Sequence, residues 1–177
     1  MRELADAERI RRFMSVVGAA AEDEGACYFT GGATAVLVGW RPSTVDVDVL
    51  FVPEQDSVLR ALTRIKDELS INVELVSPAD FIPVPAGWEE RRVFAGRAGR
   101  LSFYHFDPYA QALAKLERAH AQDLADVEAI VSAGLIDAEQ ARRYFLEIEP
   151  NLYRYPAVDP PTFRRRVDEY FGGAASP

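Results

Sequence analysis

Hydrophobic and polar residues follow helical spacing at the start of the chain and strand spacing soon afterwards. Over residues 3–22 the apolar positions recur mostly every three or four residues, which predicts an amphipathic helix. Residues 26–29 form a short apolar run rich in strand formers, and residues 30–32, T-G-G, predict a turn. Residues 33–38 then predict a second, buried helix, with Gly39 as its C-terminal cap.

The most informative pattern is T-V-D-V-D-V-L-F-V over residues 44–52. In a strand, alternate side chains point to opposite faces, so Asp46, Asp48 and Leu50 would share one face. The other face would be apolar, with Val45, Val47, Val49 and Phe51. Aspartate is a poor strand former. Two aspartates inside one strand therefore indicate a role beyond forming the strand.

Further helix and strand patterns follow in the middle of the chain. Residues 55–69 carry apolar residues at helical spacing, and residues 71–76 predict a strand with Glu74 on its polar side. Residues 92–96 and 101–106 are two strand-like runs separated by a short polar segment containing glycine, which predicts a β-hairpin.

From Asp107 onward the pattern is wholly helical. Asp107 is a capping residue, and Pro108 occupies the first helical position. Three more helices are predicted over about residues 123–132, 137–149 and 159–171. This order of elements predicts an α+β fold, in which residues 1–106 form a core with a mixed sheet. Residues 107–177 are expected to form a helical part that packs on this core.

Composition excludes several classes of protein. With 49% hydrophobic and 27% charged residues, the chain is typical of an ordinary globular protein. Its apolar runs are far shorter than the roughly 20 residues that span a bilayer, and its first residues do not have the pattern of a signal peptide. Cys27 is the single cysteine, which excludes an internal disulfide and favours the reducing cytoplasm. Its apolar neighbours predict a buried, unreactive thiol.

The charge balance limits the partners. A net charge of -8 argues against a broad nucleic-acid surface, which needs a basic footprint. It does not exclude a nucleotide that a metal and a few basic residues hold locally. Two histidines and one cysteine are too few for a zinc site. We therefore expect any metal to be a hard cation held by carboxylates.

Asp46 and Asp48 are the best candidates for such a site. On one strand face their carboxylates would lie a few ångströms apart, an arrangement that is unfavourable unless a cation neutralises it. Mg²⁺ commonly takes one or two protein carboxylates, and phosphate oxygens complete its coordination. Glu74 could add a third carboxylate if the two strands are neighbours. The glycines at 31 and 32 would let backbone amides approach a phosphate at the start of the following helix.

These motifs together resemble the signature of the polymerase-β-like nucleotidyltransferase superfamily. The resemblance is carried by the runs F-T-G-G-A at residues 29–33 and D-V-D-V-L at residues 46–50, with L-V-G, Arg41 and Thr44 between them. Within that superfamily, the motifs more specifically resemble those of the small bacterial nucleotidyltransferase-like proteins akin to minimal nucleotidyltransferases and to abortive-infection toxins. Residues 112–118 and 122–127 resemble the helical lysine and Asp-x-x-Asp segments of that subgroup.

The resemblance implies a role for each matching residue. Asp46 and Asp48 would bind Mg²⁺, and Glu74 would be the base that activates the attacking hydroxyl. The substrate-binding residues would be Gly31, Gly32, Arg41, Thr44, Lys115 and Asp123. Of these, Lys115 would contact the triphosphate, and Asp123 would orient Lys115 or the acceptor.

The implied function is Mg²⁺-dependent transfer of NMP from an NTP to a hydroxyl on an RNA such as tRNA, a protein or a small molecule. A toxin held by an antitoxin partner is a more specific version of this function. An alternative is a catalytically inactive module of the same fold that binds a nucleotide or another protein. Simpler interpretations of single residues also stay open, with Lys115 on a solvated helix face and Asp123 at a helix N-terminus.

Overall fold

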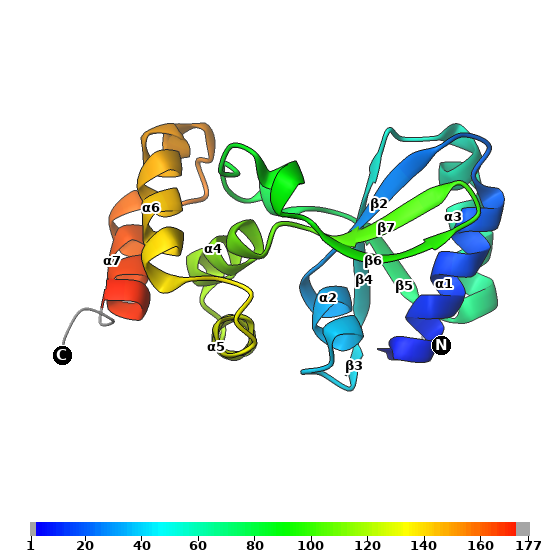
Figure 1. Ribbon diagram of the computed structural model, residues 1–177, viewed down its shortest axis with the longest axis horizontal. Helices are drawn as coiled ribbons and strands as arrows, with labels where there is room; N and C mark the ends of the chain where they lie inside the picture. The colour runs from blue at the N-terminus through cyan, green and yellow to red at the C-terminus, as the bar shows by residue number, and fades with distance from the viewer. Residues whose placement is uncertain (1–2, 173–177) are drawn as a thin grey trace. The chain divides into compact units, whose positions relative to one another are not determined.

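The computed structural model describes residues 3–172, which fold as two compact units (Figure 1). The first unit extends to Ser77 and includes Arg92–Phe106. The second unit consists of Pro78–Arg91 and of the chain from Asp107 onward. The predicted division after residue 106 is thus one of the junctions, but residues 78–91 belong with the C-terminal helices and not with the sheet.

Polar contacts within the second unit explain the placement of residues 78–91. The Arg91 guanidinium forms an ion pair of 2.7 Å with Asp107, the residue that caps the first C-terminal helix, and it lies 4.3 Å from the centre of the Tyr144 ring. The Tyr155 hydroxyl donates a hydrogen bond of 2.9 Å to the Ala79 carbonyl. These partners are distant in sequence, so local pattern could not assign this segment.

The first unit alternates helices and strands nearly as predicted. Its elements are, in chain order, β1 (Ala5–Asp6), α1 (Ala7–Ala20), β2 (Gly25–Thr30), α2 (Gly31–Val38), β3 (Ser43–Thr44), β4 (Asp46–Val52), α3 (Asp56–Leu69), β5 (Asn72–Leu75), β6 (Val93–Ala98) and β7 (Leu101–His105). Within the described residues, β1 pairs with β3, and the other strands form one sheet in the order β5-β4-β2-β7-β6. Because β4 is antiparallel to β2 and parallel to β5, the sheet is mixed. The predicted α+β fold and the β6–β7 hairpin are confirmed.

Several predicted boundaries move by a few residues. Helix α1 begins only at Ala7, because the Asp6 side chain caps it by accepting a hydrogen bond of 2.9 Å from the Arg9 amide. Helix α2 begins at Gly31, so the predicted turn is already the first turn of the helix. Strand β4 begins at Asp46, which leaves Val45 outside the strand and 64% exposed.

One face of the sheet forms the hydrophobic core with α1 and α3, which lie side by side in Figure 1. The predicted alternation along β4 is seen in its burial, because Val47, Val49 and Phe51 are buried. Asp46 and Asp48 are only half-buried and lie on the opposite face. Cys27 is fully buried in this core, and burial raises the pKa of its thiol well above the usual value, so it is unreactive as predicted.

Helix α1 and the β6–β7 hairpin meet backbone to backbone. A Cβ atom added to Gly18 would lie 2.2 Å from the Ala98 carbonyl oxygen, and one added to Gly99 would lie 2.2 Å from the Gly18 carbonyl oxygen. Gly99 also has a φ of +54°, in the left-handed region that favours glycine. Both positions therefore need glycine for helix and hairpin to pack this closely.

A buried histidine lies on the core face of the sheet. His105 is 7% exposed, and its Nδ1 is 3.1 Å from the Thr34 hydroxyl of α2. Burial lowers the pKa of His105 from 6.5 to about 4, because desolvation disfavours the charged ring. His105 is thus neutral near pH 7. His120, by contrast, has a side chain 80% exposed.

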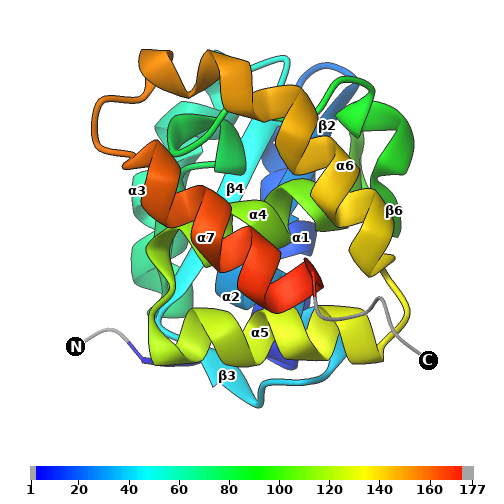
Figure 2. The same ribbon diagram turned by 90° about the vertical axis from the view of Figure 1, so that its left-hand side faces the viewer.

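The second unit is helical throughout its later part, as predicted. Its α-helices are α4 (Pro108–Arg118), α5 (Ala121–Ser132), α6 (Ala138–Ile148) and α7 (Pro160–Phe171). Helix α4 is central, since it contacts the other three, and α7 lies across it in Figure 2. Within residues 3–172, the helices are all too short or too polar to span a membrane.

We expect Gly18→Ala to destabilise the protein, although alanine normally stabilises a helix interior by about 0.5–1 kcal/mol over glycine. The added Cβ would meet the Ala98 backbone, which cannot swing away as a flexible side chain does. The net loss should be about 1–3 kcal/mol, measured by denaturant unfolding. Gly172→Ala is the matched control, because Gly172 has a φ of −79° and its nearest neighbouring atom is 4.0 Å from the Cβ position. Equal effects of the two substitutions would contradict the close packing.

His105 should make stability depend on pH between 6.5 and 4. In this range the unfolded chain binds a proton that the folded state, with its pKa of about 4, does not bind. Stability should therefore fall as the pH decreases, by about 2.5 kcal/mol between pH 7.5 and 4.5 from this residue. His105→Gln removes the titrating group, so the difference between wild type and variant should shrink by that amount on acidification. Parallel pH profiles of unfolding free energy for the two proteins would rule this out.

Candidate functional site

The two aspartates of β4 share the sheet face that points away from the core. They are separated by the buried Val47, so the alternation of the strand places both carboxylates on this face. Strand β5 is parallel to β4 with Asp48 opposite Glu74 and Asp46 opposite Asn72. Residues opposite each other in adjacent strands point to the same face. The four polar side chains of β4 and β5 therefore form one patch.

The start of α2 lies against Asp48. A Cβ atom added to Gly31 would be 2.8 Å from Oδ2 of the Asp48 carboxylate. Gly31 has a φ of +56°, which favours glycine independently of the contact. A side chain at this position would separate the carboxylate from the first backbone amides of α2, which have no acceptor inside the helix.

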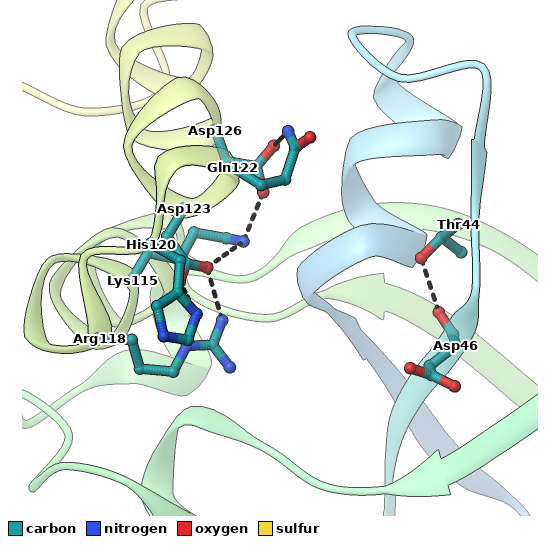
Figure 3. Close-up of polar contacts among 8 residues, drawn as sticks. All are labelled: Thr44, Asp46, Lys115, Arg118, His120, Gln122, Asp123 and Asp126. Atoms are coloured by element: carbon teal, nitrogen blue, oxygen red, sulfur yellow. Dashed lines mark hydrogen bonds and ion pairs between the residues drawn. The ribbon is translucent and has the colours of Figure 1, made fainter.

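Gly32 lets α2 approach Thr44 and Arg41. A Cβ atom at Gly32 would be 2.0 Å from the Thr44 hydroxyl and 3.5 Å from an Arg41 guanidinium nitrogen. The Thr44 hydroxyl donates a hydrogen bond of 3.0 Å to the Asp46 carbonyl (Figure 3). The structure thus brings together Gly31, Gly32, Arg41, Thr44 and Asp48, which come from three separate stretches of sequence.

Asn72 is a residue of this patch that sequence reasoning missed. Its side-chain amide donates a hydrogen bond of 2.7 Å to Asp46 Oδ1 and one of 3.2 Å to Glu74 Oε1. Asn72 could have been identified from its position two residues before Glu74, on the same face of the same strand. Asn72 holds Asp46 in place and connects it to Glu74, which is exposed.

The donors available for a metal in this patch are the two aspartate carboxylates. Among residues 3–172, no group of three or more His, Cys, Asp and Glu side chains is arranged to hold a metal ion. Glu74 is thus a neighbour of the Asp pair, in register with Asp48, and not a third member of a compact carboxylate cluster. A pair of carboxylates still matches the one or two that Mg²⁺ usually takes from a protein.

Lys115 and Asp123 lie in the second unit, where they form a buried ionic cluster (Figure 3). Lys115 is 4% exposed, and its Nζ is 2.5 Å from Asp126 Oδ2 and 3.7 Å from Asp123 Oδ1. The interpretation of Lys115 as part of a solvated helix face is therefore wrong. Lys115 is buried because α4 packs against α5. The spacing of polar residues along the sequence does not reveal this packing.

Asp126 is the closest partner of Lys115, although Asp123 was the predicted one. Asp126 is fully buried, whereas Asp123 lies closer to Arg118, at 2.7 Å, than to Lys115, at 3.7 Å. Two cations and two carboxylates balance one another in this cluster, which lowers the cost of burying each charge. Asp123 is more than a helix-terminal charge, because it is 5% exposed and paired across to α4.

The mixed sheet carries an aspartate pair beside a helix that starts with Gly-Gly. This combination is typical of the nucleotidyltransferase-like α+β class. A family model described as "Nucleotidyltransferase of unknown function (DUF6036)" matches residues 8–158. This range is most of the chain, and the chain belongs to that family. No match is found among curated proteins or among solved structures.

The contact between α2 and the start of β4 can be tested by a double-mutant cycle. Gly32→Ala should destabilise the protein by about 1–3 kcal/mol, because its Cβ would overlap the Thr44 side chain. Thr44→Gly removes the overlapping atoms, so in its presence Gly32→Ala should cost at least about 1 kcal/mol less. Unfolding free energies of the four proteins measure the coupling. Strictly additive effects would show that the two residues are not in contact.

Proposed function

We propose that this protein is a Mg²⁺-dependent nucleotidyltransferase that moves NMP from an NTP to a hydroxyl acceptor. The observation that carries the proposal is the contact of the Asp48 carboxylate with Gly31 at the start of α2. A metal-binding carboxylate and a phosphate-binding helix start can act on the same phosphate group only when they lie this close together. Membership of a nucleotidyltransferase family supports the same chemistry.

Asp46 and Asp48 would hold the metal. Both are carboxylates on one strand face, both keep solvent access, and the Asn72 amide fixes the orientation of Asp46. Without a cation their like charges repel. When bound, Mg²⁺ would neutralise this pair and the charge that develops on the phosphates.

The other residues of the patch would bind and orient the substrates. The backbone amides at Gly31 and Gly32 and the Arg41 guanidinium are donors for the triphosphate. Glu74 would accept the proton of the attacking hydroxyl, as that oxygen bonds to the α-phosphorus and the bond to the bridging oxygen breaks. Pyrophosphate leaves, and the acceptor keeps the NMP.

The proposal also assigns Lys115 a contact with the triphosphate, and it assigns Asp123 the orientation of Lys115 or of the acceptor. Their support is chemical, because a buried lysine is an expensive feature to keep for stability alone. On substrate binding, Lys115 would exchange one of its carboxylate partners for a phosphate oxygen. Asp123, held by Arg118, would then keep the lysine in position.

The acceptor would be a hydroxyl on an RNA such as tRNA, on a protein or on a small molecule. A toxin restrained by an antitoxin is the more specific form of this proposal. Growth arrest on expression of the wild type, with no arrest by an Asp48 variant, would support the toxin role. Loss of arrest on co-expression of a neighbouring gene would point to the partner.

An inactive nucleotide-binding module is the second candidate, and Asn72 favours it. Its amide engages Glu74 Oε1 as well as Asp46, so the base and one metal ligand already have a neutral partner. A module of this kind would bind Mg²⁺ and an NTP but transfer nothing.

Asp48→Asn separates the enzyme from the inactive module. The substitution keeps the size of the side chain but removes its charge, so transfer should fall at least about 100-fold while the fold persists. The assay follows label from each α-labelled NTP into cellular RNA and protein with Mg²⁺, alongside thermal unfolding. Asp67→Asn, at an exposed position of α3, is the matched control and should act as wild type.

The outcomes distinguish the candidates. Mg²⁺-dependent NTP binding without transfer by the wild type would favour the inactive module. The absence of any NTP binding would reject both. Equal activity of Asp48→Asn and wild type would remove Asp48 from the site.

A further inference from the structure

A cavity of about 410 Å³ lies beside Asp46, at the edge of the polar patch. It is lined by Glu3, Leu4, Val45, Asp46 and Asn72, all of which belong to the first unit. The volume falls in the range of about 300–1,000 Å³ that is usual for small-molecule sites. The cavity is continuous with the patch, because Asp46 and Asn72 are part of both.

The aliphatic side chains of this cavity are exposed. Leu4 is 57% exposed and Val45 is 64% exposed. The two residues are neighbours, because β1 and β3 pair antiparallel with Ala5 opposite Thr44, and the next pair in this register is Leu4 with Val45. A single exposed aliphatic residue is ordinary on a protein surface. An adjacent pair that lines a cavity beside a carboxylate offers apolar contact to a ligand bound there.

The charged side chains that line the cavity are acidic. They are Glu3 and Asp46, and no lysine or arginine of residues 3–172 lines it. Glu3 forms an ion pair with Arg9, whose guanidinium also donates a hydrogen bond of 3.3 Å to the Leu69 carbonyl. A ligand that carries phosphates, such as RNA, depends on basic residues for its binding. The cavity therefore suits a ligand without a phosphate group.

The cavity and the start of α2 lie on opposite sides of strand β4. The strand order is β5-β4-β2, and α2 continues directly from β2. The start of α2 is therefore on the β2 side of the aspartates, whereas Asn72 of β5 lines the cavity on the other side. In phosphoryl transfer the attacking and leaving oxygens are roughly in line with the phosphorus between them. With pyrophosphate held at the start of α2, the attacking hydroxyl approaches from the β5 side.

We propose that this cavity binds the acceptor, and that the acceptor is a small alcohol with aliphatic surface and no phosphate group. The inference rests on the proposed nucleotidyl transfer and selects one of its three acceptor classes. The aliphatic body would contact Leu4 and Val45, and the hydroxyl would lie beyond Asn72, near Glu74. Glu74 takes the hydroxyl proton as the oxygen bonds to the α-phosphorus. Pyrophosphate leaves with the electron pair of the broken bond, and the product is a phosphodiester of the alcohol and the nucleoside.

NMR titration of the full chain tests the cavity without catalysis. The probes are hexanediol and hexanediol monophosphate, which differ only in the phosphate, and EDTA excludes metal-dependent binding. The methyl resonances of Leu4 and Val45 should move with hexanediol and much less with the monophosphate. Val38 provides the control resonance, because it is a valine that is 43% exposed and does not line the cavity.

Transfer kinetics connect the cavity with the reaction. The assay measures transfer of label from an α-labelled NTP to hexanediol in the presence of Mg²⁺. Val45→Ser should raise the KM for hexanediol about fivefold, because it removes aliphatic contact, and should leave the KM for the NTP unchanged. Val45→Lys adds a cation to the cavity, so this variant should prefer the monophosphate to hexanediol, the reverse of the wild-type order. Val38→Ser is the matched control and should act as wild type.

The outcomes separate this inference from the function on which it rests. Label in cellular RNA or protein with none in hexanediol would overturn the inference and leave the nucleotidyltransferase standing. No NTP binding, or binding without transfer, would reject the enzyme and the acceptor role together. Equal shifts of Val38 and Val45, equal binding of the two probes, or an unchanged KM for hexanediol in Val45→Ser would each overturn the assignment of the cavity.

Discussion

The close approach of the α2 start to strand β4 is the constraint on which the arrangement of the polar patch depends. Neither Gly31 nor Gly32 has a side chain, so the first helical turn can lie against Asp48 and Thr44. A Cβ at either position would meet side-chain atoms of β3 or β4, so that a side chain or the helix would have to shift. The same helix reaches the core through Thr34, whose hydroxyl contacts Phe29 and His105. A displacement of α2 would therefore be transmitted to both faces of the sheet.

Strand β4 separates two environments because its side chains alternate. Val47, Val49 and Phe51 bury apolar surface against α1 and α3, and this burial stabilises a strand whose aspartates have low β-propensity. The aspartates in turn need partners on the other face. Asn72 supplies one of them from the neighbouring strand, and its amide, being neutral, relieves little of the repulsion between the two carboxylates.

The second unit organises its polar residues differently. Lys115, Asp123 and Asp126 are almost fully buried where α4 packs on α5, and their charges are compensated by one another and by Arg118. Arg91 makes a comparable buried contact with Asp107, where burial raises the pKa of the carboxyl despite the ion pair that opposes it. These pairs join segments that are separated in sequence, so they define which residues belong to the unit.

The sequence by itself determined the elements, the mixed α+β architecture and the two-faced character of β4, because helix and strand periodicity are local properties. It also singled out Gly31, Gly32, Asp46, Asp48 and Lys115, whose residue types are costly at those positions. Only the tertiary structure decided that residues 78–91 join the helices, that Asn72 bridges Asp46 and Glu74, and that Asp126 is the closest partner of Lys115. Strand register, helix packing and burial bring together residues distant in sequence, and no local pattern records which distant residue will be the neighbour.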